Sequence, residues 1–180
     1  MTSWARRLVE LVAGRGVPQG FPGSLESDEH VLAVAELDGG GHLVATSLGL
    51  WLPVAEGVRR VGWHLVSKAT WSGGALTVTE AEERGSAGSA VLLADLPARR
   101  FVLARPGLVP RVVQARVTGS IRSRHHRELP GGGAWFVQRR VPGADGAVLQ
   151  VRPDPGTDED AVRRIATEVA ARLEEVRRSP

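Results

Sequence analysis

Apolar and polar residues alternate along the first half of the chain, between residues 31 and 104. A period of two places successive side chains on opposite faces of an extended chain and therefore predicts β-strands. Short glycine-rich segments such as DGGG at 38–41 separate the apolar runs and favour tight turns. We expect a β-meander with strands at 31–37, 42–52, 58–71 and 75–83, then at 90–96 and 100–104.

The segment 108–117 fits two patterns. Strand alternation aligns Val113, Ala115 and Val117 on one face. Helical spacing aligns Val109, Val112, Val113 and Val117, and it puts Pro110 in the first turn, where a missing N–H costs nothing. We favour the helix. Further strands are then expected at 118–129, 134–141 and 147–153.

The two ends of the chain predict amphipathic helices. In the C-terminal segment, Thr157 with Asp160 three residues later resembles a capping box, and an apolar seam follows that must pack against another element, here a sheet. The seam consists of Val162, Ile165, Val169, Leu173 and Val176. A short helix is expected within residues 2–14. A glycine- and proline-rich connector then precedes the strands, so we divide the chain into 1–27 and a single domain at 28–180.

Many short strands with a long closing helix define an α+β domain. The segment RRVGWHLVSKATWSGGALTVTE (59–80), together with the terminal helix, resembles bacterial PH-like domains over residues 28–178. The resemblance implies a partly open antiparallel barrel closed by the C-terminal helix. The N-terminal helix and the helix at 108–117 depart from the simple PH-like pattern.

The five tryptophans are expected in two kinds of environment. Trp63 and Trp71 lie on the apolar face of the strand at 58–71, and Trp135 begins a later strand. Burial is therefore expected for these three, because large aromatic side chains contribute most to a core. Surface or interface positions are expected for Trp4 and Trp51.

The composition narrows the class of protein. The 180 residues are 42% hydrophobic and include no cysteine, which excludes disulfides and thiolate metal ligands and favours a cytoplasmic protein. No apolar run approaches the length of a membrane span, and the N-terminus does not have the pattern of a signal peptide.

Positive charge is concentrated in one segment. The net charge is only +3, and the high pI of about 10.7 follows from a chain with one lysine and no tyrosine or cysteine to titrate above neutrality. Residues 108–153 carry eight arginines against Glu128 and Asp145, a net charge of +6. The basic character is therefore local.

No motif for catalysis or for a cofactor is found. GSAGS at 85–89 lacks the spacing of a serine-hydrolase elbow, and the glycines at 14–20 lack that of a dinucleotide fingerprint. His125 and His126 are adjacent on a strand, so they point to opposite faces and are poorly placed to share a metal ion. We expect no cofactor, no metal and no enzymatic activity.

The most promising surface is an arginine-rich face on three strands. Alternation places Arg122, Arg124 and His126 on one side of the strand at 118–129, with Ile121 and Leu129 toward the core. If the next strands pair antiparallel, Arg140 and Arg152 join this face, opposite Trp135. It is either a solvated sheet face or a binding surface, because like charges on neighbouring strands repel and favour a counter-charge. An acidic protein or a phosphate-bearing partner is expected to bind either this face or an edge strand.

Two other classes of function stay open. Nucleic-acid binding is not favoured, because few aromatic residues lie among the arginines to stack on bases. A small-ligand or enzymatic role would require a pocket at the barrel mouth, with His64, His125 or Glu80 inside it.

Overall fold

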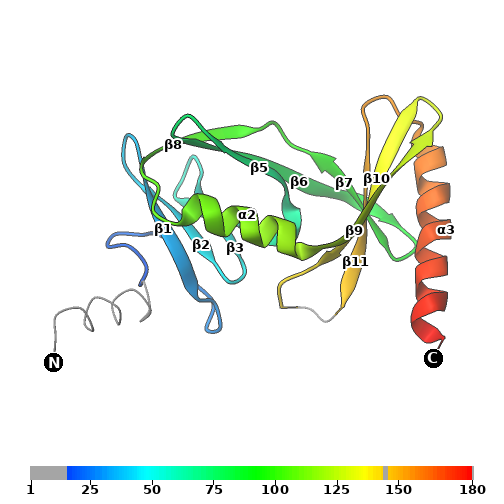
Figure 1. Cartoon of the computed structure of the whole chain (residues 1–180), viewed down its shortest axis with the longest axis horizontal. Helices are drawn as coiled ribbons and strands as arrows, with labels where there is room; N and C mark the ends of the chain where they lie inside the picture. The colour runs from blue at the N-terminus through cyan, green and yellow to red at the C-terminus, as the bar shows by residue number, and fades with distance from the viewer. Residues whose placement is uncertain (1–15, 144–145, 180) are drawn as a thin grey trace.

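Two lobes share one long strand, β6 (Figure 1). The structure is a computed structural model that describes residues 16–143 and 146–179. The helix expected within residues 2–14 lies outside the described residues. The N-terminal lobe contains β1–β5, β8 and α2, and the C-terminal lobe contains β7, β9–β11 and α3. The fold is α+β with a large, mostly antiparallel sheet, as the sequence predicted.

The elements begin and end at the following residues. The strands of the N-terminal lobe are β1 (Val31–Leu37), β2 (His42–Thr46), β3 (Gly49–Pro53), β4 (Val58–Gly62), β5 (Val66–Ser72) and β8 (Arg99–Arg105), with the 3-10 helix η1 (Trp63–Leu65) before β5. The shared strand is β6 (Ala75–Ala87), and the strands of the C-terminal lobe are β7 (Ala90–Asp95), β9 (Ile121–Leu129), β10 (Gly132–Arg140) and β11 (Ala147–Pro153). The helices are α2 (Val109–Ser120) and α3 (Glu159–Arg178).

Two of the predicted strands are each broken into two elements. The strand expected at 42–52 turns at Ser47 and Leu48, because the Thr46 hydroxyl accepts hydrogen bonds from the backbone N–H groups of Leu48 and Gly49 at 3.3 and 3.2 Å. The strand expected at 58–71 is interrupted by η1, so β5 runs in a different direction from β4 and pairs with β6.

The sheet is open, and two helices cover two separate cores. Its strand order is β4-β3-β2-β1-β8-β6-β7-β11-β10-β9, with β5 paired to β6. The favoured helix at 108–117 is confirmed as α2, which packs on β1, β2 and β5 over the core of the N-terminal lobe. The terminal helix α3 was expected to close a single barrel, but it packs on β6, β7 and β11 over a second core. Its N-cap is Asp158, whose carboxylate accepts from Ala161 N at 2.7 Å, and not Thr157.

The tryptophan predictions hold only in part. Trp63 is buried as expected, and its Nε1 donates to the Thr46 carbonyl at 3.0 Å. Trp71 is 43% exposed, because it lies near the end of β5, where the strand extends past the core. Trp135 is half-buried, and Trp51, expected at the surface, is only 8% exposed. Trp4 lies outside the described residues.

A buried carboxylate explains the burial of Trp51. The Glu29 side chain is fully buried and accepts hydrogen bonds from Trp51 Nε1 at 2.9 Å, Thr46 Oγ1 at 2.5 Å and Arg60 Nη1 at 2.5 Å. Burial by itself would raise the pKa of Glu29, but these bonds, together with one from the Glu26 N–H, outweigh it and lower the pKa. The cluster joins the segment before β1 to β2, β3 and β4.

Glu29→Gln should lower the free energy of unfolding at neutral pH by about 2 kcal/mol, the typical loss for hydrogen bonds to a buried charge. Because folding lowers the pKa of Glu29, the stabilisation is present above its unfolded pKa of about 4.5 and is lost as pH falls through the lower folded pKa. Urea unfolding at several pH values measures this, and Glu29→Gln should flatten the acid dependence. Glu26→Gln, on the exposed partner of Arg60, is the control and should change little.

A buried guanidinium forms hydrogen bonds between the two lobes. Arg139, on β10, is only 4% exposed. Its Nη2 donates to the Val66 carbonyl at 2.9 Å, its Nη1 to the His64 carbonyl at 3.3 Å and its Nε to Ser120 Oγ at 2.7 Å. Burial, and to a lesser extent the charge of Arg152, lowers the pKa of Arg139 to about 10, so the side chain stays protonated at neutral pH.

The acceptors around Arg139 come from the end of α2, from η1 and from the start of β5. A longer bond to the Val117 carbonyl, at 3.4 Å, adds a group of the last helical turn, where the helix dipole is negative and favours a cation. Gln150 on β11 adds a parallel link, because its Nε2 donates to the His64 carbonyl at 2.9 Å. Polar side chains of the C-terminal lobe are therefore bonded to backbone of the N-terminal lobe.

Arg139→Met should lower the free energy of unfolding by about 3 kcal/mol, because buried acceptors of the N-terminal lobe lose their donor from the C-terminal lobe. Arg140→Met, at the next and exposed position, should change it by less than about 0.5 kcal/mol. Denaturant unfolding of both variants measures the difference. Equal, small effects would contradict the role given to Arg139.

Candidate functional site

The strand register divides the predicted arginine face into two groups. Residues directly opposite each other in an antiparallel pair have side chains on the same face. Trp135 lies opposite both His126 and Arg152, and Val137 lies opposite Arg124. Three of the five predicted residues, Arg124, His126 and Arg152, therefore share one face with Trp135, which had been expected on the opposite face.

Arg140 and Arg122 do not belong to that face. Arg140 lies opposite Ala147 and shares the face of Phe136, which packs toward α3. A register shift between Gln138 and Arg139 leaves Arg122 in an irregular step of β9 and places Ile121 opposite Arg139. The prediction of one three-strand arginine face, with Ile121 and Leu129 together toward the core, is therefore wrong. The physical reason is the irregularity in β9, because one extra residue reverses the alternation beyond it.

Two members of the first group lie beside acidic residues. Arg152 Nη1 lies 3.5 Å from Asp95 Oδ1, and His126 Nε2 lies 2.7 Å from Asp154 Oδ2. The Arg124 guanidinium lies 5.5 Å from the centre of the Trp135 ring, within the range of a cation–π contact. This face carries little free positive charge apart from Arg124.

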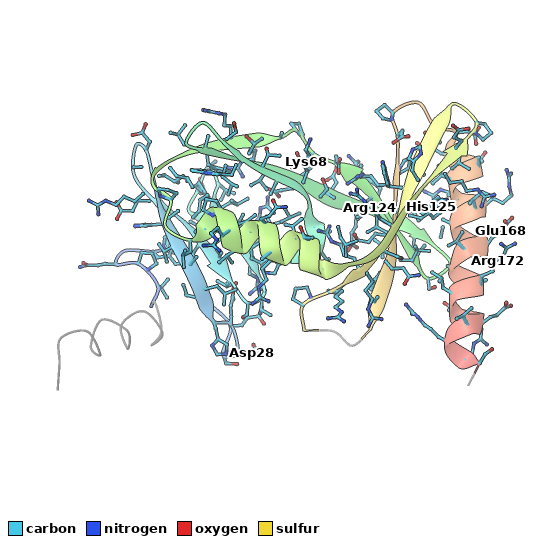
Figure 2. All side chains as sticks on the ribbon, in the orientation of Figure 1. Asp28, Lys68, Arg124, His125, Glu168 and Arg172 are labelled. Carbon is cyan, nitrogen blue, oxygen red and sulfur yellow. The ribbon has the colours of Figure 1, made fainter. Side chains whose placement is uncertain are left out.

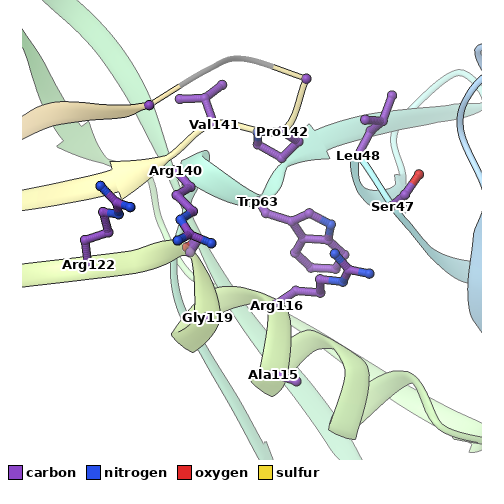
Figure 3. A pocket seen from close by; sticks show the side chains of 13 residues that line it. Ser47, Leu48, Trp63, Ala115, Arg116, Gly119, Arg122, Arg140, Val141 and Pro142 are labelled. Carbon is purple, nitrogen blue, oxygen red and sulfur yellow. The ribbon is translucent and has the colours of Figure 1, made fainter.

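The second group lines a pocket of about 670 Å³ where the two lobes meet (Figure 3). Arg122 and Arg140 are joined there by Arg116, from the last turns of α2, which sequence reasoning did not select. The buried Trp63 lies beside Arg116, and Ser47 from the β2–β3 turn contributes a hydroxyl (Figure 3). The three arginines come from three different elements, so only the tertiary structure brings them together.

The electrostatics of this pocket are one-sided. None of the described residues that line it is acidic, and the three arginines are exposed. Among the described residues none of the three forms a salt bridge. Guanidinium groups are planar donors that match the geometry of phosphate and carboxylate oxygens, and three like charges around one pocket favour an anion.

The three residues considered for an enzymatic pocket lie in different environments. Glu80 is buried, with Oε2 2.6 Å from Arg59 Nη2. Burial lowers the pKa of His64, and its buried Nδ1 has no hydrogen-bond partner in the described part of the chain. His125 lines a shallow groove between β9 and α3. Across residues 16–143 and 146–179, no three His, Cys, Asp or Glu side chains are placed to hold a metal ion.

Comparison of the chain with protein-family models, with curated proteins and with solved structures gives no match. None of the described helices has the length and apolar character needed to cross a membrane.

Proposed function

We propose that this protein is a non-enzymatic interaction domain that binds an anionic group of its partner in the pocket lined by Arg116, Arg122 and Arg140. The observation that carries the proposal is the convergence of three exposed arginines from α2, β9 and β10 on one pocket without an acidic lining residue among those described. The ligand chemistry is that of phosphate or carboxylate oxygens, which accept charge-assisted hydrogen bonds from guanidinium groups.

The PH-like relationship is part of this proposal. The meander β1–β4, the strands β5, β6 and β8, and the helix α2 on their core follow the order expected for such a domain. The helix that would close it is then α2 rather than α3. On this interpretation, the C-terminal lobe is an addition whose β9 and β10 each supply one arginine to the pocket.

The position of the pocket separates a binding role from a purely structural one. Arg122 and Arg140 also lie near the C-terminal end of α2, where any cation is favourable to the helix. That role needs neither three arginines nor a hollow between them. A ligand-binding role predicts a loss of affinity that is larger than any loss of stability.

Arg116→Glu and Arg140→Glu should each weaken the binding of inorganic phosphate by about tenfold or more, because each replaces a charge-assisted bond with repulsion. Chemical shifts of the Arg116 and Gly119 amides, followed by NMR during phosphate titration at low salt, give the affinity. Arg100→Glu is the matched control, since it makes the same change in net charge at an exposed position of β8.

Phosphate binding that survives both pocket variants, in protein that remains folded, would contradict the proposal. A protein that ignores phosphate but binds a random single-stranded oligonucleotide, with an affinity that falls steeply with salt, would support nucleic-acid binding instead.

A further inference from the structure

The β9 strand ends the sheet in an open edge. It is the last strand of the order, and it pairs only with β10. In an antiparallel strand, alternate residues direct their N–H and C=O groups away from the partner. In the described part of the chain, the groups of β9 that face away from β10 have no hydrogen-bond partner in any loop or side chain. Its nine residues therefore form a template for one more strand.

The C-terminal end of β9 is held in place by contacts with the loop before α3. His126 Nε2 lies 2.7 Å from Asp154 Oδ2. In the β9–β10 turn, Asp158 N donates a hydrogen bond to the Pro130 carbonyl at 2.9 Å. In the same turn, Gly131 has a φ of +81°, and a Cβ there would lie 2.4 Å from the Gly156 carbonyl oxygen. The turn is therefore packed directly against the loop before α3, and the edge is ordered before any strand joins it.

The other end of the sheet is less suited to this role. There β4 has only five residues, and Arg60 on it is bound by Glu26 and Glu29 of the segment before β1. The edge at β9 has nine residues, and its three arginines form no salt bridge with any residue that the structure describes.

The charges along β9 decide which strand fits. Arg122, Arg124 and Arg127 are exposed, and Glu128 is the strand's one acidic residue (Arg124 and His125 are labelled in Figure 2). If two copies of β9 paired with each other, the arginines of one strand would lie near the arginines of the other and repel them. The same arginines would face opposite charges if the incoming strand were acidic. The edge therefore disfavours a second copy of this chain and favours an acidic segment.

We propose that β9 accepts an extended acidic segment of a partner protein as an additional β-strand. Backbone hydrogen bonds to the open edge supply binding, and Arg124 and Arg127, which lie on opposite faces of β9, select for carboxylates on both faces of the incoming strand. The inference concerns the edge of β9 and extends the function beyond the anion pocket. It uses Arg124 and Arg127, neither of which lines that pocket.

The test is a capped peptide in which pairs of glutamates alternate with pairs of threonines, so that both faces of the added strand carry carboxylates, and it is about ten residues long to match β9. Two further versions carry N-methyl groups, one on every odd-numbered residue and the other on every even-numbered residue. In an added strand only one of the two sets of N–H groups faces β9. One methylated version should therefore bind about tenfold more weakly or worse, and the other should bind like the parent peptide.

Amide hydrogen exchange in the full chain supplies a second measurement. The unmethylated peptide at millimolar concentration should slow exchange about tenfold at alternate residues of β9, and not at the residues between them, which are already bonded to β10. Arg124→Glu and Arg127→Glu should each weaken peptide binding, whereas Arg100→Glu should leave it unchanged.

Three outcomes would overturn the proposal: equal effects of the two methylation patterns, unchanged exchange along β9, or no binding at millimolar peptide. Failure of this proposal can be distinguished from failure of the proposed anion pocket. Arg116→Glu should reduce phosphate binding and spare the peptide, and Arg127→Glu should do the reverse.

Discussion

The arrangement of the two lobes depends on the buried guanidinium of Arg139. Each lobe has its own apolar core under its own helix, and the shared strand β6 connects them. Hydrogen bonds from Arg139 to the carbonyls of His64 and Val66 and to the Ser120 hydroxyl fix how β10 meets α2 and β5. A rigid planar fork imposes directions that a flexible ammonium group would not. Burying such a charge is costly, and here carbonyl groups and a helix terminus compensate for it.

This junction also determines where the free positive charge lies. Arg140 follows Arg139 on β10, and Arg122 follows the α2 terminus whose last turn Arg139 binds. Because β9, β10 and α2 are held together at this junction, the side chains of Arg122 and Arg140 line the same pocket as Arg116. The anion pocket is thus a consequence of the lobe interface. The open edge of β9 begins at the same place and runs away from it, so the two proposed binding features share one strand.

Most elements were predictable, because alternation and helical spacing are local properties. The exceptions have physical causes. Hydrogen bonds to the Thr46 hydroxyl turn the chain within the strand expected at 42–52, and η1 interrupts the strand expected at 58–71. Trp51 was expected at the surface, since nothing nearby in sequence indicates that Glu29 would supply its hydrogen-bond acceptor. The prediction of a single arginine face was wrong for a similar reason. A single irregular step in β9 separated Arg122 from Arg124, and alternation cannot show where a strand shifts register.

The sequence by itself determined the α+β class, the helix at α2, the long amphipathic α3 and the concentration of arginine between residues 108 and 153. Each of these follows from composition or from a repeat over a few residues. The tertiary structure decided that there are two cores, that the terminal helix covers the second, and which arginines are buried, paired or free. These outcomes depend on contacts between residues far apart in the chain, such as Arg139 with His64, and no local pattern encodes them.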